Sequence, residues 1–300
     1  MIVGLFIIIA CMRVIQSYSN KQVSMLIDSR MKFFEYGAYY QFVSAAFSIV
    51  TLCIAGFYGL DGVTAICALL SALLFAVELY AGIEALKGGT MVLCSMFAQG
   101  GLFVPCILGI FLFNEPMSIF QWLGLAVFVC SAGLLASGSN ESGQKLTWRT
   151  VGMLFLSFLS GGFVMVVQKY FAILVPDGNV AMFSFLTFAF NAVILAGAAL
   201  ALFIFGGKTE DGQRKYAYEK LHKKQYVFGA LLGLAVFAIN LIVTSMAKKV
   251  PSVVLFPVSS AISLAITTTI GAVVYKEKLT LKNVCGVVLG LASVIVINVL

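Results

Sequence analysis

Ionisable side chains interrupt several apolar stretches of this chain at positions where they could do chemistry. Glu78 lies within the run 74–80, and Lys21 and Lys169 each close an apolar stretch that also carries amide groups. A carboxyl group in apolar surroundings could bind a cation or exchange a proton, whereas a lysine ammonium could attract a carboxylate or a phosphate. Structural roles stay open, because Glu78 could form an internal ion pair and long lysine side chains can reach the membrane surface.

Uncharged amides form a second group of candidates. An amide in hydrocarbon without a partner costs several kcal/mol, so each must bind a ligand or donate to a neighbouring helix. The stretch that contains Arg13 continues with a polar run too hydrophilic to face lipid, and Arg13 or Lys21 could pair with Glu78. The candidate substrate-binding residues are Asn20, Lys21, Glu78, Gln99, Gln168, Lys169 and Asn240.

Patterns for catalysis or metal binding do not accompany these residues. The seven cysteines lie in apolar stretches without a CxxC pair, and the single histidine, His222, lies in a charged stretch. We therefore expect no metal site, no cofactor and no disulfide. The chain carries no Walker motif, HExxH motif or Ser-His-Asp set, so we expect no enzyme activity, and any pumping must use an ion or substrate gradient. The net charge of +7 is spread over several loops, which predicts no nucleic-acid partner.

The elements that position these residues follow from composition. Of the 300 residues, 61% are hydrophobic and 10% are charged, whereas soluble domains are about half apolar and about a quarter charged. This predicts a multi-pass integral protein of the cell membrane, surrounded by the lipid bilayer. A membrane-spanning helix needs about 20 mostly apolar residues. The stretches that qualify are 2–26, 35–57, 64–86, 90–113, 117–137, 151–174, 180–206, 226–247, 251–274 and 281–300.

The two halves of the chain resemble each other. The surroundings of Glu115 recur around Glu277, an offset of 162 residues that also relates Glu78 to Asn240. Earlier in each half, 14–21 resembles 162–169, which matches Lys21 with Lys169 and Asn20 with Gln168. Because each half has an odd number of spans, the second must enter the membrane from the opposite side. We predict an all-α membrane protein of ten helices in two inverted five-helix repeats, 1–137 and 151–300, joined by a polar linker, 138–150.

Local features within these spans predict bends and tight packing. Pro105 and Pro257 lie inside spans and are expected to kink them. The glycine pairs 100–101 and 161–162 allow close packing or bending, and 286–290 is a GxxxG face through which a homodimer could form. Glu115 and Glu277 precede helices and are interpreted as structural turn residues.

Three segments carry a family resemblance. They are 111–116 (FLFNEP) with Gln121 and Gly124, 274–279 (VYKEKL) with Gly286, and 251–257 (PSVVLFP). With these segments in place, the chain resembles the drug/metabolite transporter superfamily, within its EamA-type group. The resemblance implies a bundle of five plus five helices whose central cavity is lined mainly by spans 1, 3, 4, 6, 8 and 9.

The expected function is secondary transport of a small polar metabolite, such as an amino acid or a related organic ion, by alternating access, with a proton as the candidate coupling ion. The alternatives are a flippase for a lipid-linked substrate and a non-transporting membrane receptor or enzyme. Lateral openings between helices would favour the flippase, and a closed polar cavity favours the transporter. Lysines and arginines concentrate in the loops opposite the termini, which favours termini outside the cytosol. The resemblance implies the reverse, so the orientation stays open.

Overall fold

The computed structural model describes residues 2–101, 103–112, 147–206, 220–248, 250, 252–276 and 280–299, with 118–120, 122–124, 126–127, 129–131 and 134 between them. All elements within these residues are helices, which confirms the all-α class. They are α1 (Ile2–Ser24), α2 (Arg30–Ala55), α3 (Gly62–Gly88), α4 (Met91–Gly100), α5 (Phe103–Leu112), α7 (Trp148–Leu174), α8 (Val180–Phe205), α9 (Lys223–Ala247), α10 (Ser252–Val273) and α11 (Leu281–Val299).

Five of the described helices, α2, α3, α7, α8 and α9, are long and apolar enough to cross a bilayer. Their bounds agree with the predicted spans to within a few residues. The predicted span 117–137 is described only in part, and Glu115, Glu277 and the side chain of Gln99 lie outside the described residues.

Helix starts are fixed by short polar side chains that accept hydrogen bonds from the first turn. The Asp61 carboxylate accepts from the backbone N–H of Thr64 at 2.6 Å at the start of α3. Asn179 accepts from two backbone N–H groups at the start of α8. At its C-terminal end, α2 is capped by Gly56. The φ of 93° at this residue is a backbone conformation that glycine adopts without strain.

The stretch predicted as one span over 90–113 is two helices, α4 and α5, and the break has a local cause. Pro105 has no N–H to donate to Gly101, and the backbone N–H of Val104 donates to the Gly101 carbonyl at 3.0 Å instead. At this break Gly101 lies against Gly162 of α7, so close that a Cβ on Gly101 would stand 2.7 Å from the Gly162 nitrogen. By contrast, α10 continues through Pro257.

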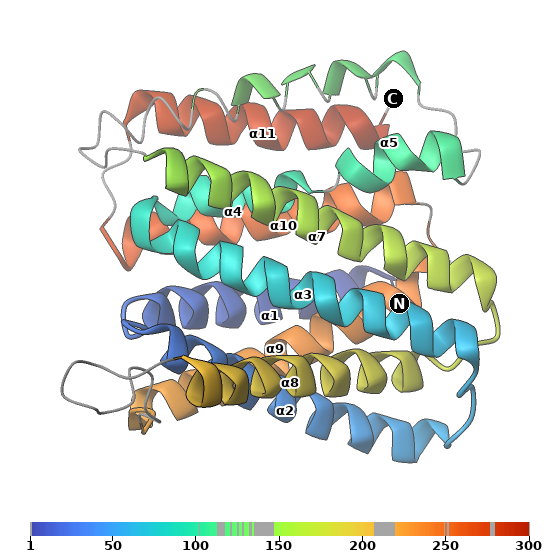
Figure 1. The fold of residues 1–300 in the computed structure, drawn as a ribbon. Helices are drawn as coiled ribbons and strands as arrows, with labels where there is room; N and C mark the ends of the chain where they lie inside the picture. Colours follow the sequence, from blue (N-terminus) through green and yellow to red (C-terminus); the bar gives the residue numbers. More distant parts are fainter. Residues whose placement is uncertain are drawn as a thin grey trace.

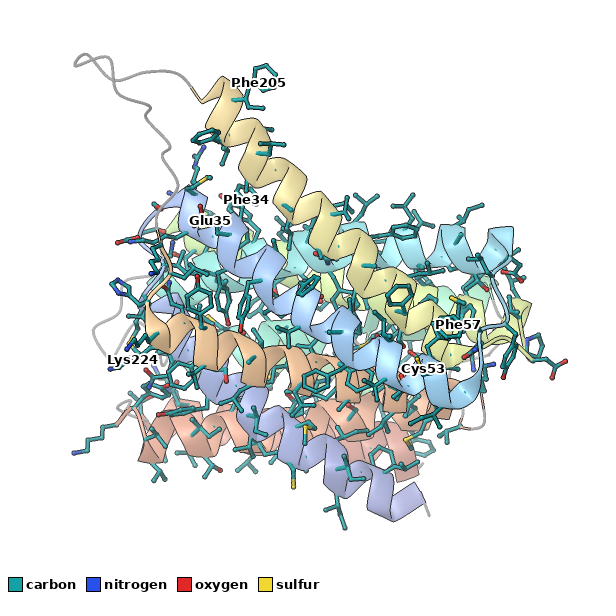
Figure 2. The ribbon with its side chains drawn as sticks, turned by 90° about the horizontal axis from the view of Figure 1, so that it is seen from below. Phe34, Glu35, Cys53, Phe57, Phe205 and Lys224 are labelled. Carbon is teal, nitrogen blue, oxygen red and sulfur yellow. The ribbon has the colours of Figure 1, made fainter. Side chains whose placement is uncertain are left out.

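The helices lie roughly alongside one another, so the bundle has two ends (Figure 1). The linker end holds the last turn of α1, the last turn of α3 and the start of α7. The terminal end holds both chain termini and the α2–α3 and α7–α8 connections (Figure 1). Figure 2 shows Glu35, Phe205 and Lys224 at the linker end and Cys53 and Phe57 at the other.

Packing joins the helices into pairs whose members come from different halves of the sequence. α1 packs against α9, α3 packs against α7, and α2 packs against α8. The α1–α9 pair and the α3–α7 pair form the middle of the bundle, with α2 and α8 on one side and α4, α10 and α11 on the other (Figure 1). Candidate functional residues are positioned by these two central pairs.

Lys248, directly after α9, makes side-chain hydrogen bonds that connect two segments at the terminal end of the bundle. Its ammonium donates to the backbone carbonyls of Val175, Pro176 and Gly178, at 3.4, 2.8 and 2.7 Å. The Phe171 ring lies 5.6 Å from the same ammonium. The side chain thus ties the end of α9 to the α7–α8 turn.

A Lys248→Met protein is expected to unfold at lower temperature. The substitution keeps most of the side-chain volume but leaves three carbonyls without this donor. We expect a loss of about 1–2 kcal/mol, below the full value of charged hydrogen bonds because Lys248 is half-exposed. Thermal unfolding of the detergent-purified protein measures this, with Lys224→Met, at an exposed position, as the control. Equal melting temperatures for the two variants would contradict a stabilising role for the Lys248 hydrogen bonds.

Candidate functional site

A cavity of about 160 Å³ lies between the α1–α9 pair and the α3–α7 pair, in the half of the bundle nearer the linker end. Helices α1, α3, α4, α7, α9 and α10 all line it, together with Tyr40 of α2. Its polar lining side chains are Arg13, Gln16, Ser17, Asn20, Tyr40, Glu78, Cys94, Ser95, Ser157, Ser263 and Thr267.

One face of α1 supplies much of this polarity. Arg13, Gln16, Ser17 and Asn20 are spaced at i, i+3, i+4 and i+7, which places them on one side of a helix. The Nη1 atom of Arg13 donates to the Gln16 side-chain oxygen at 2.8 Å. The Arg13 Nε is buried and makes no hydrogen bond within the described residues. Arg13 lines the cavity, so its guanidinium can meet a molecule that enters it.

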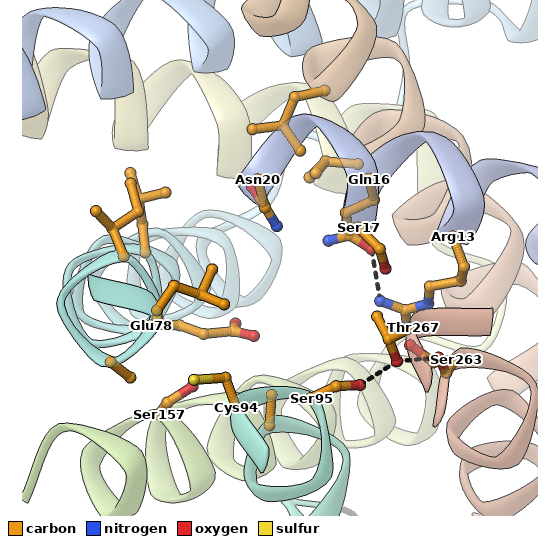
Figure 3. A pocket seen from close by; sticks show the side chains of 18 of the residues that line it. Arg13, Gln16, Ser17, Asn20, Glu78, Cys94, Ser95, Ser157, Ser263 and Thr267 are labelled. Atoms are coloured by element: carbon orange, nitrogen blue, oxygen red, sulfur yellow. Dashed lines mark hydrogen bonds between the residues drawn. The ribbon is translucent and has the colours of Figure 1, made fainter. Parts of the chain in front are cut away.

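Glu78 faces this surface from α3, across the open part of the cavity (Figure 3). Gly161 of α7 lies behind the carboxyl group, and a Cβ there would stand 3.3 Å from the Glu78 Oε1 atom. Within the described part of the chain, no hydrogen bond or salt bridge to Glu78 forms, although its charge attracts that of Arg13. A carboxylate so placed can accept hydrogen bonds from a ligand.

Hydroxyl groups of α4 and α10 form the floor below Arg13. Ser95 and Thr267 share a hydrogen bond, and Thr267 also donates to the backbone carbonyl of Ser263 (Figure 3). These contacts join α4 to α10. The floor is therefore polar but uncharged in the described residues.

A second cavity, about 80 Å³, continues from the first toward the terminal end. Arg13, Gln16 and Glu78 line both cavities. At its far end the Gln168 Nε2 donates to the Asn240 Oδ1 at 2.6 Å, and the Asn240 Nδ2 donates to the Ser184 hydroxyl at 3.1 Å. These buried contacts join α7, α9 and α8, and they lie toward the terminal end of the second cavity.

The structure brings together four of the residues that the sequence singled out: Asn20, Glu78, Gln168 and Asn240 line the two cavities. Lys21 and Lys169 are not among the lining residues. The Lys21 ammonium lies 5.9 Å from the centre of the Tyr275 ring, and Lys169 is buried within α7.

Arg13, Gln16 and the hydroxyl groups of α10 line the cavity but were not among the substrate-binding residues predicted from the sequence. A signal for them existed. The polar positions of α1 have helical spacing, and Ser259, Ser263 and Thr267 follow at intervals of four in α10.

The hydrogen bonds at the terminal end should control access to the cavity from that end. An Asn240→Leu protein is expected to lose about 1–2 kcal/mol of stability, the upper range for polar contacts between membrane helices. It should also label faster from the terminal end at a cysteine replacing Val236, which lines both cavities and precedes Asn240 in α9.

Asn191→Leu is the matched control, because Asn191 also donates between helices, to the Ala72 carbonyl at 2.9 Å, but lines neither cavity. It should lower stability without raising labelling. Equal labelling in both variants would count against a closing role for Asn240.

Comparisons with known proteins give a family match and similar folds. The model of the EamA-like transporter family matches residues 148–299. Among solved structures, 26 chains match. One, a crystal structure, shares 12% sequence identity and covers 98% of this chain and 96% of its own, with a TM-score of 0.61, which indicates a common fold. No curated protein sequence matches.

Proposed function

Since the chain belongs to the EamA-like transporter family, of the drug/metabolite transporter superfamily, we propose that it is a secondary transporter that moves a small polar metabolite by alternating access. Membership makes it a multi-pass membrane transporter. The observation that carries the finer proposal is the central cavity, where Arg13 and Glu78 face each other without forming a salt bridge.

The packing supports two inverted repeats, 1–137 and 151–300, with ten spans. Suppose that α1, α2, α3 and α4 of the first repeat correspond to α7, α8, α9 and α10 of the second. Replacing each helix by its counterpart then turns every packed pair named here into another pair that also packs in the structure. The α1–α9 pair then becomes α7–α3, α1–α10 becomes α7–α4, and α2–α8 maps onto itself. α1 starts at the terminal end and α7 at the linker end (Figure 1), as an inverted repeat requires.

Alternating access needs a cavity that is closed toward one side of the membrane while it is open toward the other, and the polar contacts toward the two ends of the bundle differ accordingly. Toward the terminal end, Gln168 of α7 and Asn240 of α9 are joined by a hydrogen bond. Their counterparts by the repeat are Asn20 of α1 and Glu78 of α3, which both line the cavity without a mutual hydrogen bond. We propose that rocking the α1–α9 pair against the α3–α7 pair joins Asn20 to Glu78 and parts Gln168 from Asn240. The cavity would then open to the terminal end.

Glu78 is the proposed ion-coupling group. Its charge can be neutralised by a proton or by a bound cation, and a conformational cycle needs a group whose charge differs between its states. Because the described helices surround the cavity on several sides and its centre carries two opposite charges, a polar substrate fits it better than the chain of a lipid-linked one.

A dimer through the GxxxG face of α11 has less support, because Gly286 accepts a hydrogen bond from Ser131 of the same chain.

Transport tests the proposal directly. The protein would be reconstituted into proteoliposomes preloaded with unlabelled compounds, and entry of the same compound in radioactive form would be followed. Counterflow, a transient accumulation above equilibrium, is expected for at least one small polar metabolite. Flux of fluorescent lipid between leaflets without counterflow of any soluble compound would instead favour the flippase.

A further inference from the structure

We propose that the cavity binds a zwitterion, with Arg13 holding its anionic group and Glu78 holding its cationic group. This rests on the proposed function and specifies its substrate. The opposite charges line one cavity from α1 and α3, and their separation exceeds the 4.0 Å of a salt bridge, since none forms between them in the described residues. A ligand with a charge of each sign fits between them.

The anionic half of the site is the Arg13 guanidinium. One of its terminal nitrogens is used by Gln16, which fixes the plane of the group. The buried Nε has no hydrogen-bond partner within the described residues. A guanidinium offers several N–H donors in a fixed fork that matches a carboxylate. Because Arg13 lines the cavity, a ligand carboxylate bound there could accept hydrogen bonds from the guanidinium.

The cationic half is the Glu78 carboxylate. Gly161 behind it leaves room for the carboxyl group, since a Cβ there would stand 3.3 Å from the Glu78 Oε1 atom. The Asn20 amide lies near the open space between the two charged groups (Figure 3). An ammonium group can donate up to three hydrogen bonds, so a ligand ammonium could contact both Glu78 and Asn20.

A zwitterion also suits the electrostatics better than a simple ion does. A charge removed from water needs a partner, and an unpaired buried charge is costly. A cation would neutralise Glu78 and leave Arg13 without its counter-charge, and an anion would do the reverse. A zwitterion compensates both groups at once, and it carries no net charge through the membrane.

Binding assays on the full-length protein test this inference. The probes are the twenty standard L-amino acids, β-alanine and γ-aminobutyrate, which vary the spacing of the charges. For the best ligand we would add its carboxamide, which is a cation, and its N-acetyl derivative, which is an anion. A specific ligand raises the melting temperature by mass action. We expect one zwitterion to bind at least about 10-fold more tightly than either derivative, since each derivative lacks one charged contact.

Two substitutions should change this discrimination in opposite ways. Arg13→Gln should weaken zwitterion binding about 10- to 100-fold and abolish the preference for the zwitterion over its carboxamide. Glu78→Gln should abolish the preference over the N-acetyl derivative. The controls are Arg149→Gln and Glu84→Gln, which remove a salt bridge of 2.6 Å between residues that do not line the cavity. Both should keep full discrimination.

If Arg13→Gln does not fold, Arg13→Lys retains the charge and should keep the preference at lower affinity. The inference is overturned if a singly charged derivative binds the unsubstituted protein as tightly as the zwitterion, if the variants keep full discrimination, or if no probe raises the melting temperature. Counterflow of a simple cation or anion would reject the zwitterion as substrate but would support the proposed transport function. Binding of a zwitterion without any flux of it would support the binding site but would contradict the proposed transport function.

Discussion

A Glu78→Gln protein is expected to fold normally and to lose nearly all transport. Glutamine has the shape of glutamate but cannot carry its charge. Within the described residues, Glu78 forms no hydrogen bond or salt bridge, so its replacement breaks no direct contact, but it removes the charge that attracts Arg13. Stability should therefore fall by about 1–2 kcal/mol, less than for a broken buried ion pair. A charged contact to substrate or coupling ion is worth a factor of about 10 to 100. Melting temperature and counterflow, measured on the same preparation, check both expectations.

Glu84→Gln is the control on the same helix. Glu84 lies nearer the linker end, where it forms salt bridges with Lys87 at 2.7 Å and Arg149 at 2.6 Å, so its loss should leave transport intact. If Glu78 served as a buried structural ion pair, Glu78→Gln would cost about 3–5 kcal/mol and transport would fall with the amount of folded protein. A folded and fully active Glu78→Gln protein would contradict both roles.

A Gly162→Ala protein is expected to be strongly destabilised. Gly162 of α7 meets Gly101 at the break between α4 and α5, and a Cβ on Gly162 would stand 2.5 Å from the Gly101 carbonyl oxygen. This obstacle is backbone, which cannot turn aside as a side chain can. Overpacking a tight contact costs about 1–3 kcal/mol, and we expect the upper part of that range or failure to accumulate in the membrane. Thermal unfolding measures it.

Gly152→Ala is the matched control within α7. A Cβ at Gly152 has no other atom within 4 Å, and alanine favours a helix over glycine by about 1 kcal/mol. Gly152→Ala should therefore leave the melting temperature unchanged or raise it. A Gly162→Ala protein as stable as Gly152→Ala would show that α4, α5 and α7 do not cross closely.

Much of the fold could be predicted because the residues within each spanning helix are enough to identify it. Helices α3 and α7 begin and end close to the predicted bounds, since a long apolar run and a polar cap suffice to define them. Glu78 stood out for the same reason, because a carboxyl group in an apolar helix is costly wherever that helix packs. The repeat correspondence of Asn20 with Gln168 and of Glu78 with Asn240 also came from the sequence.

The sequence could not show which helices pack together. The hydrogen bond between Gln168 and Asn240 depends on α7 meeting α9, and nothing local to either residue encodes that contact. The charges of Lys21 and Lys169 predict cavity positions for both, yet it is Arg13, earlier in α1, that lines the cavity. The break before Phe103 was also missed as a boundary, because the close approach of Gly101 to Gly162 is a tertiary contact.

The central claim is that one cavity is reached from the two sides of the membrane in turn, and thiol labelling tests it most directly. In a protein whose seven cysteines are replaced by alanine, single cysteines would replace Ser157, which lines the linker-end cavity, or Val243, near the terminal end. A membrane-impermeant thiol reagent would be added to one side at a time. Saturating substrate should slow labelling at Ser157→Cys from the linker end and speed labelling at Val243→Cys from the terminal end. Labelling that changes in the same direction at both positions, or that never reaches Val243→Cys while transport proceeds, would contradict alternating access.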